Sequence, residues 1–218
     1  MNSVDDYLNR TRSAVEKLFT AVDSYYLLLS YPKRPVFVTW DSDEARVNAE
    51  YEKWAQQNSQ LIQERLNRDD EFAQETFAIT TLCSAILQFA YMAIKQFSRN
   101  VVVPTDFQGV IKPDNIAARF CIGRLIDDVP IGLIIYAGRN QSHHYDETTY
   151  REPTPIIFSK LANWYSPQFQ KHFVDDRYDL ANPRITNFAA HILHKLDWHS
   201  CDSYENDIRS LFPTHSAP

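Results

Sequence analysis

Glycine is scarce in this chain and occurs only four times in 218 residues. Proteins built from sheets need more glycine, because many turns and bulges require backbone conformations that other residues adopt at a cost. The scarcity therefore favours an all-α protein. A chain of this length can bury a full hydrophobic core, and we expect one helical domain over residues 1–218 rather than two domains.

Apolar residues recur at helical spacing along most of the sequence, which predicts a succession of helices. The first, over residues 4–30, is long and amphipathic and ends at Tyr31-Pro32. The second, over 43–67, is mostly polar. The third, over about 70–98, is apolar enough to form the centre of the core. Shorter helices are predicted over about 113–126, from Pro130 onward, and over 156–165, 184–198 and 202–212.

The segments between these helices contain turn-forming, polar or β-branched residues. Asp69 and Asp70 are expected to cap or interrupt the third helix. Trp164 and Tyr165 fall on the helix predicted over 156–165, where we expect them to pack in the core, with stacking on an unpaired base as the alternative. A short extended piece is expected at residues 36–40 and loops at 100–107 and 167–183.

The chain carries a net charge of −6 at neutral pH. Proteins that coat nucleic acids carry broad basic faces, so this balance argues against that class and confines any RNA contact to a local site. The three widely separated cysteines predict buried thiols in a reducing compartment. An acidic start, and the lack of any apolar run judged long enough to span a bilayer, predict a cytoplasmic protein with no membrane partner.

The segment 131–147 turns abruptly from an apolar run into a cluster of polar groups suited to phosphate chemistry. Arg139 is permanently charged and planar, and His144 can exchange a proton near neutral pH. On a helix, Asn140 and His144 lie one turn apart on one face, while Arg139 and His143 form the neighbouring pair. These groups are the minimum needed to break a phosphodiester bond without a metal ion.

This cluster resembles the signature of the HEPN superfamily, whose ribonuclease members carry an arginine, then a polar residue, then a histidine after four to six intervening residues. Here the signature reads Arg139, Asn140 and His144. The arginine–histidine spacing alone recurs elsewhere in the chain, but only Arg139 is followed by the preferred asparagine and emerges from an apolar helical run. The two other occurrences are Arg184 with His191 and Arg209 with His215.

The resemblance implies an all-α, HEPN-like antiparallel helical bundle with additional N- and C-terminal helices and a motif core at about 113–165. It also implies a symmetric homodimer that cuts RNA without a metal or cofactor and leaves a cyclic phosphate. In that reaction His144 would transfer protons at the 2′-hydroxyl or the leaving oxygen, Arg139 would hold the phosphate, and Asn140 would orient His144 or the phosphate. Phage defence or a toxin–antitoxin system, with an antitoxin or defence partner, would be its setting.

Several roles stay open at this level. His143 and Tyr145 are candidate RNA-binding residues, although His143 could equally be a simple exposed residue. Some HEPN toxins carry a tyrosine two residues after the histidine, where this chain has Asp146. Asp146 and Glu147 could also merely neutralise the cationic cluster. The alternative function is therefore a non-catalytic HEPN-like module that binds RNA, a nucleotide or a protein partner.

A second group of potential metal ligands lies near the C-terminus. It has histidines three and eight residues after His191 and a cysteine two residues further on, at Cys201. Structural zinc sites draw their ligands from tighter, paired arrangements, so we expect no metal here. His143, His144 and Asp146 lack the further ligands that would make a metal site specific.

Overall fold

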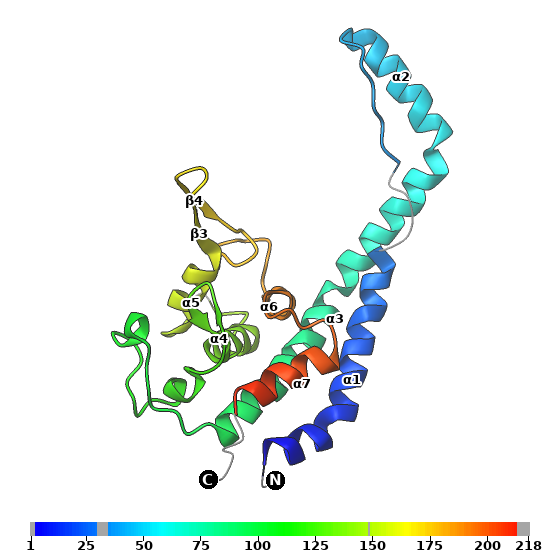
Figure 1. Cartoon of the computed structure of the whole chain (residues 1–218). Helices are drawn as coiled ribbons and strands as arrows, with labels where there is room; N and C mark the ends of the chain where they lie inside the picture. The colour runs from blue at the N-terminus through cyan, green and yellow to red at the C-terminus, as the bar shows by residue number, and fades with distance from the viewer. Residues whose placement is uncertain (1–2, 30–34, 148, 213–218) are drawn as a thin grey trace. The chain divides into compact units, whose positions relative to one another are not determined.

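The computed structural model of the chain describes residues 3–29, 35–147 and 149–212. Most of these residues are helical and the sheets are small, which confirms the expectation of an all-α protein (Figure 1). The helices are α1 (Val4–Leu29), α2 (Glu44–Gln57), α3 (Ser59–Phe97), α4 (Ile131–His143), α5 (Thr154–Ala162), α6 (Ala189–Lys195) and α7 (Cys201–Ser210), with short 3₁₀ turns η1 (Thr105–Phe107) and η2 (Ile116–Phe120). Two antiparallel pairs join β1 (Leu125–Ile126) to β2 (Val129–Pro130) and β3 (Asn163–Ser166) to β4 (Lys171–Val174).

The chain divides into two compact units, one of residues Val22–Ala78 and one of Met1–Ala21 with Ile79–Pro218. Helices α1 and α3 contribute residues to both units. The expectation of a single domain stays a prediction. The predicted end of the first helix at Tyr31-Pro32 lies outside the described residues.

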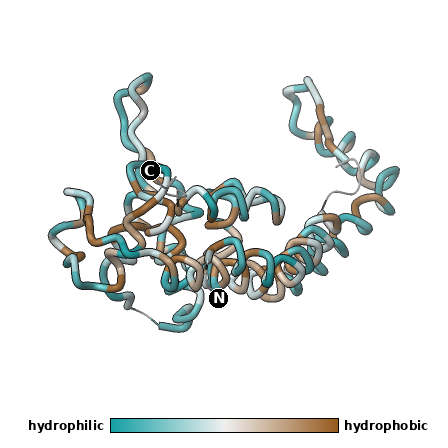
Figure 2. The backbone as a smooth tube through the Cα atoms, turned by 60° about the horizontal axis from the view of Figure 1, so that its bottom comes forward, coloured by the Kyte–Doolittle hydropathy of each residue, from teal (hydrophilic) through white to brown (hydrophobic). Residues whose placement is uncertain are grey.

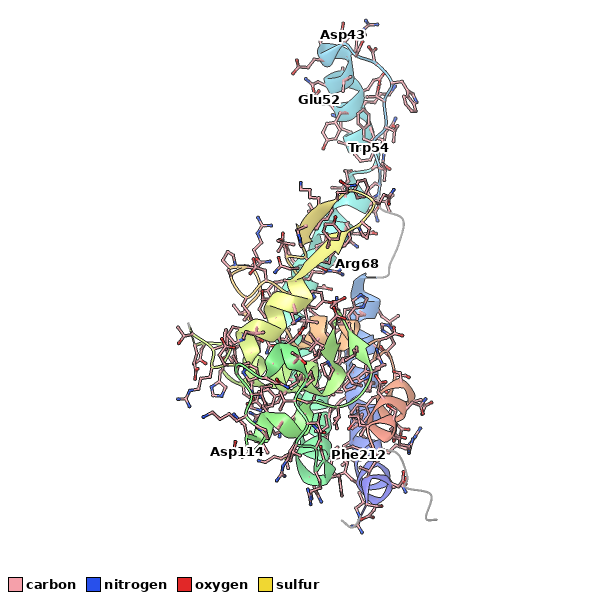
Figure 3. All side chains as sticks on the ribbon, turned by 60° about the vertical axis from the view of Figure 1, so that its left-hand side comes forward. Asp43, Glu52, Trp54, Arg68, Asp114 and Phe212 are labelled. Atoms are coloured by element: carbon pink, nitrogen blue, oxygen red, sulfur yellow. The ribbon has the colours of Figure 1, made fainter. Side chains whose placement is uncertain are left out.

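The unit of Val22–Ala78 contains α2, which begins where the Asp43 side chain accepts hydrogen bonds from two backbone N–H groups (Figure 3). No residue of α2 is buried. Its Tyr51 and Trp54 rings lie 5.4 and 5.7 Å from the ring of Phe37, which belongs to the preceding extended segment. Residues 36–40 form no helix and alternate between more and less exposed side chains, which confirms the expected extended piece. The neighbouring helix α2 is mostly hydrophilic (Figure 2).

The boundary predicted between the second and third helices is wrong. The second helix ends at Gln57, and α3 begins at Ser59 rather than near residue 70. Asp69 and Asp70 lie inside α3, and an ion pair of 2.7 Å between Arg65 and Asp69, four residues apart, stabilises the helix at this point.

The second half of α3 forms the centre of the larger unit, as expected. Its inward face is fully buried at Ile86, Leu87, Ala90 and Ile94. Within the described residues, the stretch Gln74–Phe97 is long and apolar enough to cross a membrane by length and composition, contrary to the expectation that no run would be. Half of this stretch is buried in the protein, which is also how the core helix of a folded domain behaves.

Helices α1 and α7 pack beside this part of α3. The hydroxyl of Tyr7 on α1 donates to the backbone oxygen of Phe89 at 2.8 Å. Arg12 on α1 reaches the buried carboxylate of Glu205 on α7 at 2.7 Å. The ring of Phe97 contacts Phe212, which is labelled in Figure 3, with centroids 6.3 Å apart. These contacts fix the C-terminal helix against the start of the chain.

The helix predicted over 113–126 is wrong for most of its length, because this segment bonds to the start of α4 instead of to itself. The backbone oxygens of Ile122 and Arg124 accept from the N–H groups of Gly132 and Ile131 at 3.1 and 2.9 Å. Only η2 is helical there, and the chain then forms β1 and turns back through Asp127 and Asp128, both in left-handed conformation.

The helix predicted over 156–165 is wrong at its end, since α5 stops at Ala162 and Trp164 and Tyr165 lie in β3. The predicted loop at 167–183 contains β4, which pairs with β3 to form a hairpin beyond the end of α5 (Figure 1). Aromatic residues favour strands when a partner strand is available, which explains the change. The last two helices are shorter than predicted, at Ala189–Lys195 and Cys201–Ser210.

Candidate functional site

Helix α4 carries the Arg–Asn–His cluster out of the core at its C-terminal end. Its first eight residues are buried except for Tyr136, which is half-buried. Arg139 and Asn140 then occupy the last turns, and His143 is the final helical residue. His144 caps the helix, where its backbone N–H donates to the oxygens of Asn140 and Gln141. The buried first part of α4 therefore holds the partly exposed polar residues at its C-terminal end in place.

Gln141 anchors this end of the helix and has no exposed surface. Its amide nitrogen donates to the backbone oxygen of Thr186 at 2.8 Å and to the hydroxyl of Tyr150 at 3.2 Å. Its amide oxygen accepts from the backbone N–H of Phe188 at 2.9 Å. Gln141 thus joins the helix to the segments before α5 and α6.

Arg139 lies against α3. Its Nε donates to Oε1 of Gln88 at 2.9 Å, and its guanidinium carbon lies 4.8 Å from the centre of the Tyr91 ring. A third contact, of 3.3 Å, joins Nη1 to Oδ1 of Asn140. Stacking on an aromatic ring fixes the plane of a guanidinium and leaves its edge able to donate to an anion.

His144 is held by Glu147. Nδ1 of His144 lies 2.6 Å from Oε1 of Glu147, and both side chains are about half exposed. In the neutral imidazole a proton on Nδ1 donates to the carboxylate, and this hydrogen bond assigns the free lone pair to Nε2. The pair therefore presents a proton acceptor to its surroundings.

His143 turns back onto its own helix. Its Nδ1 lies 3.0 Å from the backbone oxygen of Arg139. Partial burial, and then the positive charge of Arg139, lower the pKa of His143 below its usual value. His143 is thus engaged with the helix end, whereas Tyr145, the other candidate RNA contact, is exposed beyond it.

A pocket of 290 Å³ opens beside the helix end. Asn140 and His144 both line it, whereas Arg139, His143 and Tyr145 do not. The structure thus brings together two of the three residues of the Arg–Asn–His signature, and the third is linked to them through its contact with Asn140. The other residues that line the pocket are Tyr136, Glu147, Tyr150, Arg151, Glu152 and Thr154.

The pocket carries both signs of charge. Among the described residues that line it, Glu147 and Glu152 contribute two carboxylates and Arg151 contributes a permanent positive charge. Among the residues that the structure describes, no side-chain hydrogen bond or ion pair engages Arg151, so its guanidinium is available to a ligand. An anion would enter this pocket only with Arg151 or a further arginine as its counter-charge.

Sequence reasoning missed several residues of this site. Glu147 was considered only as a neutralising charge, although its position three residues after His144 is the spacing of side-chain contact in a helical turn. Tyr150, Arg151 and Glu152 lie beyond the motif, and Gln141 lies within it. Nothing in the sequence distinguishes Gln141 as buried, because its partners belong to segments far along the chain.

The alternative sites do not assemble in the described parts of the chain. No group of three or more His, Cys, Asp or Glu side chains there could hold a metal ion. The rings of His194 and His199 lie 5.9 Å apart, and Nε2 of His199 is paired with Asp197 at 2.8 Å. Arg209 is paired with Asp5 and Glu205, and His215 lies outside the described residues.

Comparison with protein-family models, with curated proteins and with solved structures finds no match to this chain.

Proposed function

We propose that this chain is a metal-independent endoribonuclease of the HEPN type, built as a HEPN-like helical bundle with additional terminal helices. The observation that carries the proposal is the pair formed by His144 and Glu147 in a pocket that Asn140 also lines. A histidine held through Nδ1 by a carboxylate presents Nε2 as a general base, which contributes about 10²–10⁴ in rate when its substrate is positioned.

In the proposed reaction, Nε2 of His144 takes the proton of a ribose 2′-hydroxyl. The resulting oxygen attacks the adjacent phosphorus, the bond to the 5′-oxygen breaks, and the departing oxygen takes up a proton from water. The products carry a 2′,3′-cyclic phosphate and a 5′-hydroxyl, and His144 then releases its proton to solvent. A cation must neutralise the charge that develops on the phosphate. The requirement for a 2′-hydroxyl restricts the reaction to RNA.

Arg139 is the proposed source of that charge, and it acts across a two-fold homodimer. Within one chain Arg139 does not line the pocket of His144. If two copies meet at their motif helices, the partner's Arg139 approaches the pocket with its edge free to bind phosphate oxygens. Asn140, which contacts its own Arg139 at 3.3 Å, would connect the two halves of the site.

The proposed setting is cytoplasmic RNA cleavage in phage defence or in a toxin–antitoxin system, with an antitoxin or defence protein as a further partner. The resemblance of Arg139, Asn140 and His144 to the HEPN signature supports this setting.

The second candidate is a non-catalytic module that binds RNA, a nucleotide or a protein. The carboxylates of Glu147 and Glu152 favour it, because they reduce the attraction of the pocket for a phosphate backbone. The binding module does not, however, explain why Nε2 of His144 is left free to accept a proton.

Cleavage of a mixed single-stranded RNA pool in the presence of EDTA separates the two candidates. The nuclease should cut RNA with EDTA present and leave cyclic phosphate ends, and His144→Ala should slow cleavage by about a hundredfold or more. His143→Ala is the matched control and should cost less, because that imidazole is bonded to its own helix. The same protein should have the mass of a dimer in light scattering.

Intact RNA after incubation with wild-type protein would reject the nuclease, as would equal cleavage by wild type and His144→Ala. Cleavage that EDTA abolishes and zinc restores would assign the histidines to a metal instead.

A further inference from the structure

The β3–β4 hairpin carries aromatic rings that the protein does not bury. Trp164, Tyr165 and Phe169 are 49%, 50% and 64% exposed. In the paired register Trp164 lies opposite Phe173 and Tyr165 opposite His172. Since neighbouring residues of a strand point to opposite faces, Trp164 and Phe173 share one face of the hairpin, and Tyr165 and His172 share the other.

The face of Trp164 is the more extensive aromatic surface. The Trp164 and Phe173 rings are stacked, with centroids 4.9 Å apart and planes inclined by 19°. Phe169 packs edge-on against Phe173 at 6.1 Å, and the Lys171 ammonium lies 5.6 Å from the centre of the Phe173 ring. The hairpin therefore presents an indole stacked on a phenyl ring, with a cation at the phenyl ring, and unpaired bases can stack on a surface of this kind.

The charge of the hairpin favours a polyanion. Residues 163–174 include no aspartate or glutamate, one lysine and one histidine, in a chain whose net charge is −6. A hollow of 700 Å³ continues from Trp164 and Phe173 towards the base of the hairpin. Other residues that line it include Arg177, Lys195, Asp127, Asp175 and Asp176.

Two of the three carboxylates at that base are neutralised within the chain. Asp127 pairs with Lys195 at 2.6 Å, and Asp175 pairs with Arg177 at 2.8 Å. The acid-free part of the surface is thus the hairpin itself. A polyanion is expected to contact the outer hairpin rather than its base.

We infer that the Trp164 face of the hairpin binds single-stranded RNA by stacking unpaired bases on Trp164, with Lys171 beside the phosphate backbone. The inference rests on the proposed function, because it names the surface that holds the RNA outside the pocket. Helix α5 connects the two places. Thr154 at its first residue lines the pocket, and β3 follows its last residue. Nine helical residues span about 13 Å, so one strand several nucleotides long can contact both.

The test measures fluorescence anisotropy of a labelled oligouridylate in titrations with the His144→Ala protein, which keeps the RNA intact. Adding Trp164→Ala should weaken binding about tenfold, as expected for the loss of one base stack. Tyr165→Ala is the matched control, because Tyr165 is equally exposed on the opposite face, and it should weaken binding much less. Trp40→Ala, which removes a ring that is 96% exposed in the other unit, should have no effect.

A second substitution tests whether a loss of binding results from misfolding of the hairpin. Phe173→Leu keeps an apolar residue opposite Trp164 and should preserve the urea unfolding curve while weakening binding less than Trp164→Ala. A duplex of the same length should bind more weakly than the single strand, because its bases are already stacked on one another. With His144 restored, Trp164→Ala should raise the KM for long RNA.

Unchanged affinity in Trp164→Ala would overturn the inference even if cleavage of RNA is confirmed. Absence of oligouridylate binding by the parent protein would also overturn it. A change of mass in light scattering for Trp164→Ala, without a change of RNA affinity, would overturn it in favour of an interface between copies. Trp164-dependent binding by a protein that cuts no RNA would uphold the inference and reject the nuclease.

Discussion

Nδ1 of His144 lies 2.6 Å from Oε1 of Glu147, just past the end of α4. The carboxylate comes from the residue three positions further on, so the pair forms locally and needs no distant segment. The hydrogen bond places the proton of the neutral imidazole on Nδ1 and holds the ring in one orientation at the end of the helix. This relationship makes Glu147 a positioning residue for the proposed proton transfer.

Glu147→Gln should therefore lower kcat for RNA cleavage by about tenfold and leave KM nearly unchanged, because it weakens the carboxylate hydrogen bond that orients His144. Steady-state kinetics on a short RNA checks this split. Glu152→Gln removes a carboxylate from the same pocket without touching His144, and it should not lower kcat. Equal losses in the two variants would mean that Glu147 acts only through the charge of the pocket.

The stability of the protein should decrease in mild acid. Burial, and then the charge of Arg177, lower the pKa of His191, which lies between the rings of Tyr178 and Phe188. The pKa of His143 is lowered in the same direction. The unfolded chain then binds protons at a higher pH than the folded chain, so the free energy of unfolding should fall as the pH drops through about 6.5, the value of a free histidine.

Urea unfolding at neutral pH and near pH 5 measures this dependence. His191→Gln cannot take up a proton, so it should flatten the pH dependence relative to wild type. His172→Gln, at an exposed histidine of β4, is the control and should keep the wild-type slope. A slope that is the same in all three proteins would assign the acid sensitivity to other groups.

Gly132→Ala should destabilise the protein by about 1–3 kcal/mol, because overpacking at a rigid contact forces the backbone to move. A Cβ atom at this position would lie 2.3 Å from the backbone oxygen of Phe120, which cannot rotate away. Gly109→Ala, with nothing within 4 Å of the added atom, is the control. Urea unfolding of both variants checks the prediction, and equal stability would contradict the close packing of α4 on η2.

Gln141→Leu should lower the free energy of unfolding by about 2–6 kcal/mol. It keeps the volume but leaves the buried N–H of Phe188 and the oxygen of Thr186 without their partner, and each such group costs about 1–3 kcal/mol. Gln108→Leu removes one hydrogen bond from an exposed glutamine and should change stability by about 0.5 kcal/mol at most. A differential scanning calorimeter is sufficient to compare the two variants.

The sequence predicted the elements whose pattern is local. The long first helix, the apolar α3 and the helix that carries Arg139 are confirmed, because each has enough turns for its periodicity to be clear. The segment before Pro130 was wrong, since its hydrogen bonds go to Ile131 and Gly132. The sequence pattern predicts a helix at Trp164 and Tyr165, because the partner strand, which begins six residues after Tyr165, leaves no local signal.

The candidate site divides in the same way. The one-turn spacing of Asn140 and His144 placed both correctly on one side of the helix, and they line one pocket. That spacing could not show that Arg139 stacks on Tyr91, 48 positions earlier in the chain, because this contact depends on how α4 packs on α3. The walls of the pocket at Tyr150–Thr154 follow from the same tertiary packing.

A low count of glycines directs attention to backbone conformation, but most of the glycines in this chain lie at sites of close packing. The left-handed positions at Asp127, Asp128, Gln170 and Asp197 are filled by larger residues, and among the described glycines Gly123 alone has a left-handed backbone. Of the four glycines, Gly123, Gly132 and Gly138 lie where an added carbon would collide with a neighbouring segment. Two of these three lie on the helix that carries Arg139 and His143. At these two positions glycine permits close packing against a neighbouring segment. Replacement of glycine by larger residues should therefore be tolerated least where that helix contacts its neighbours.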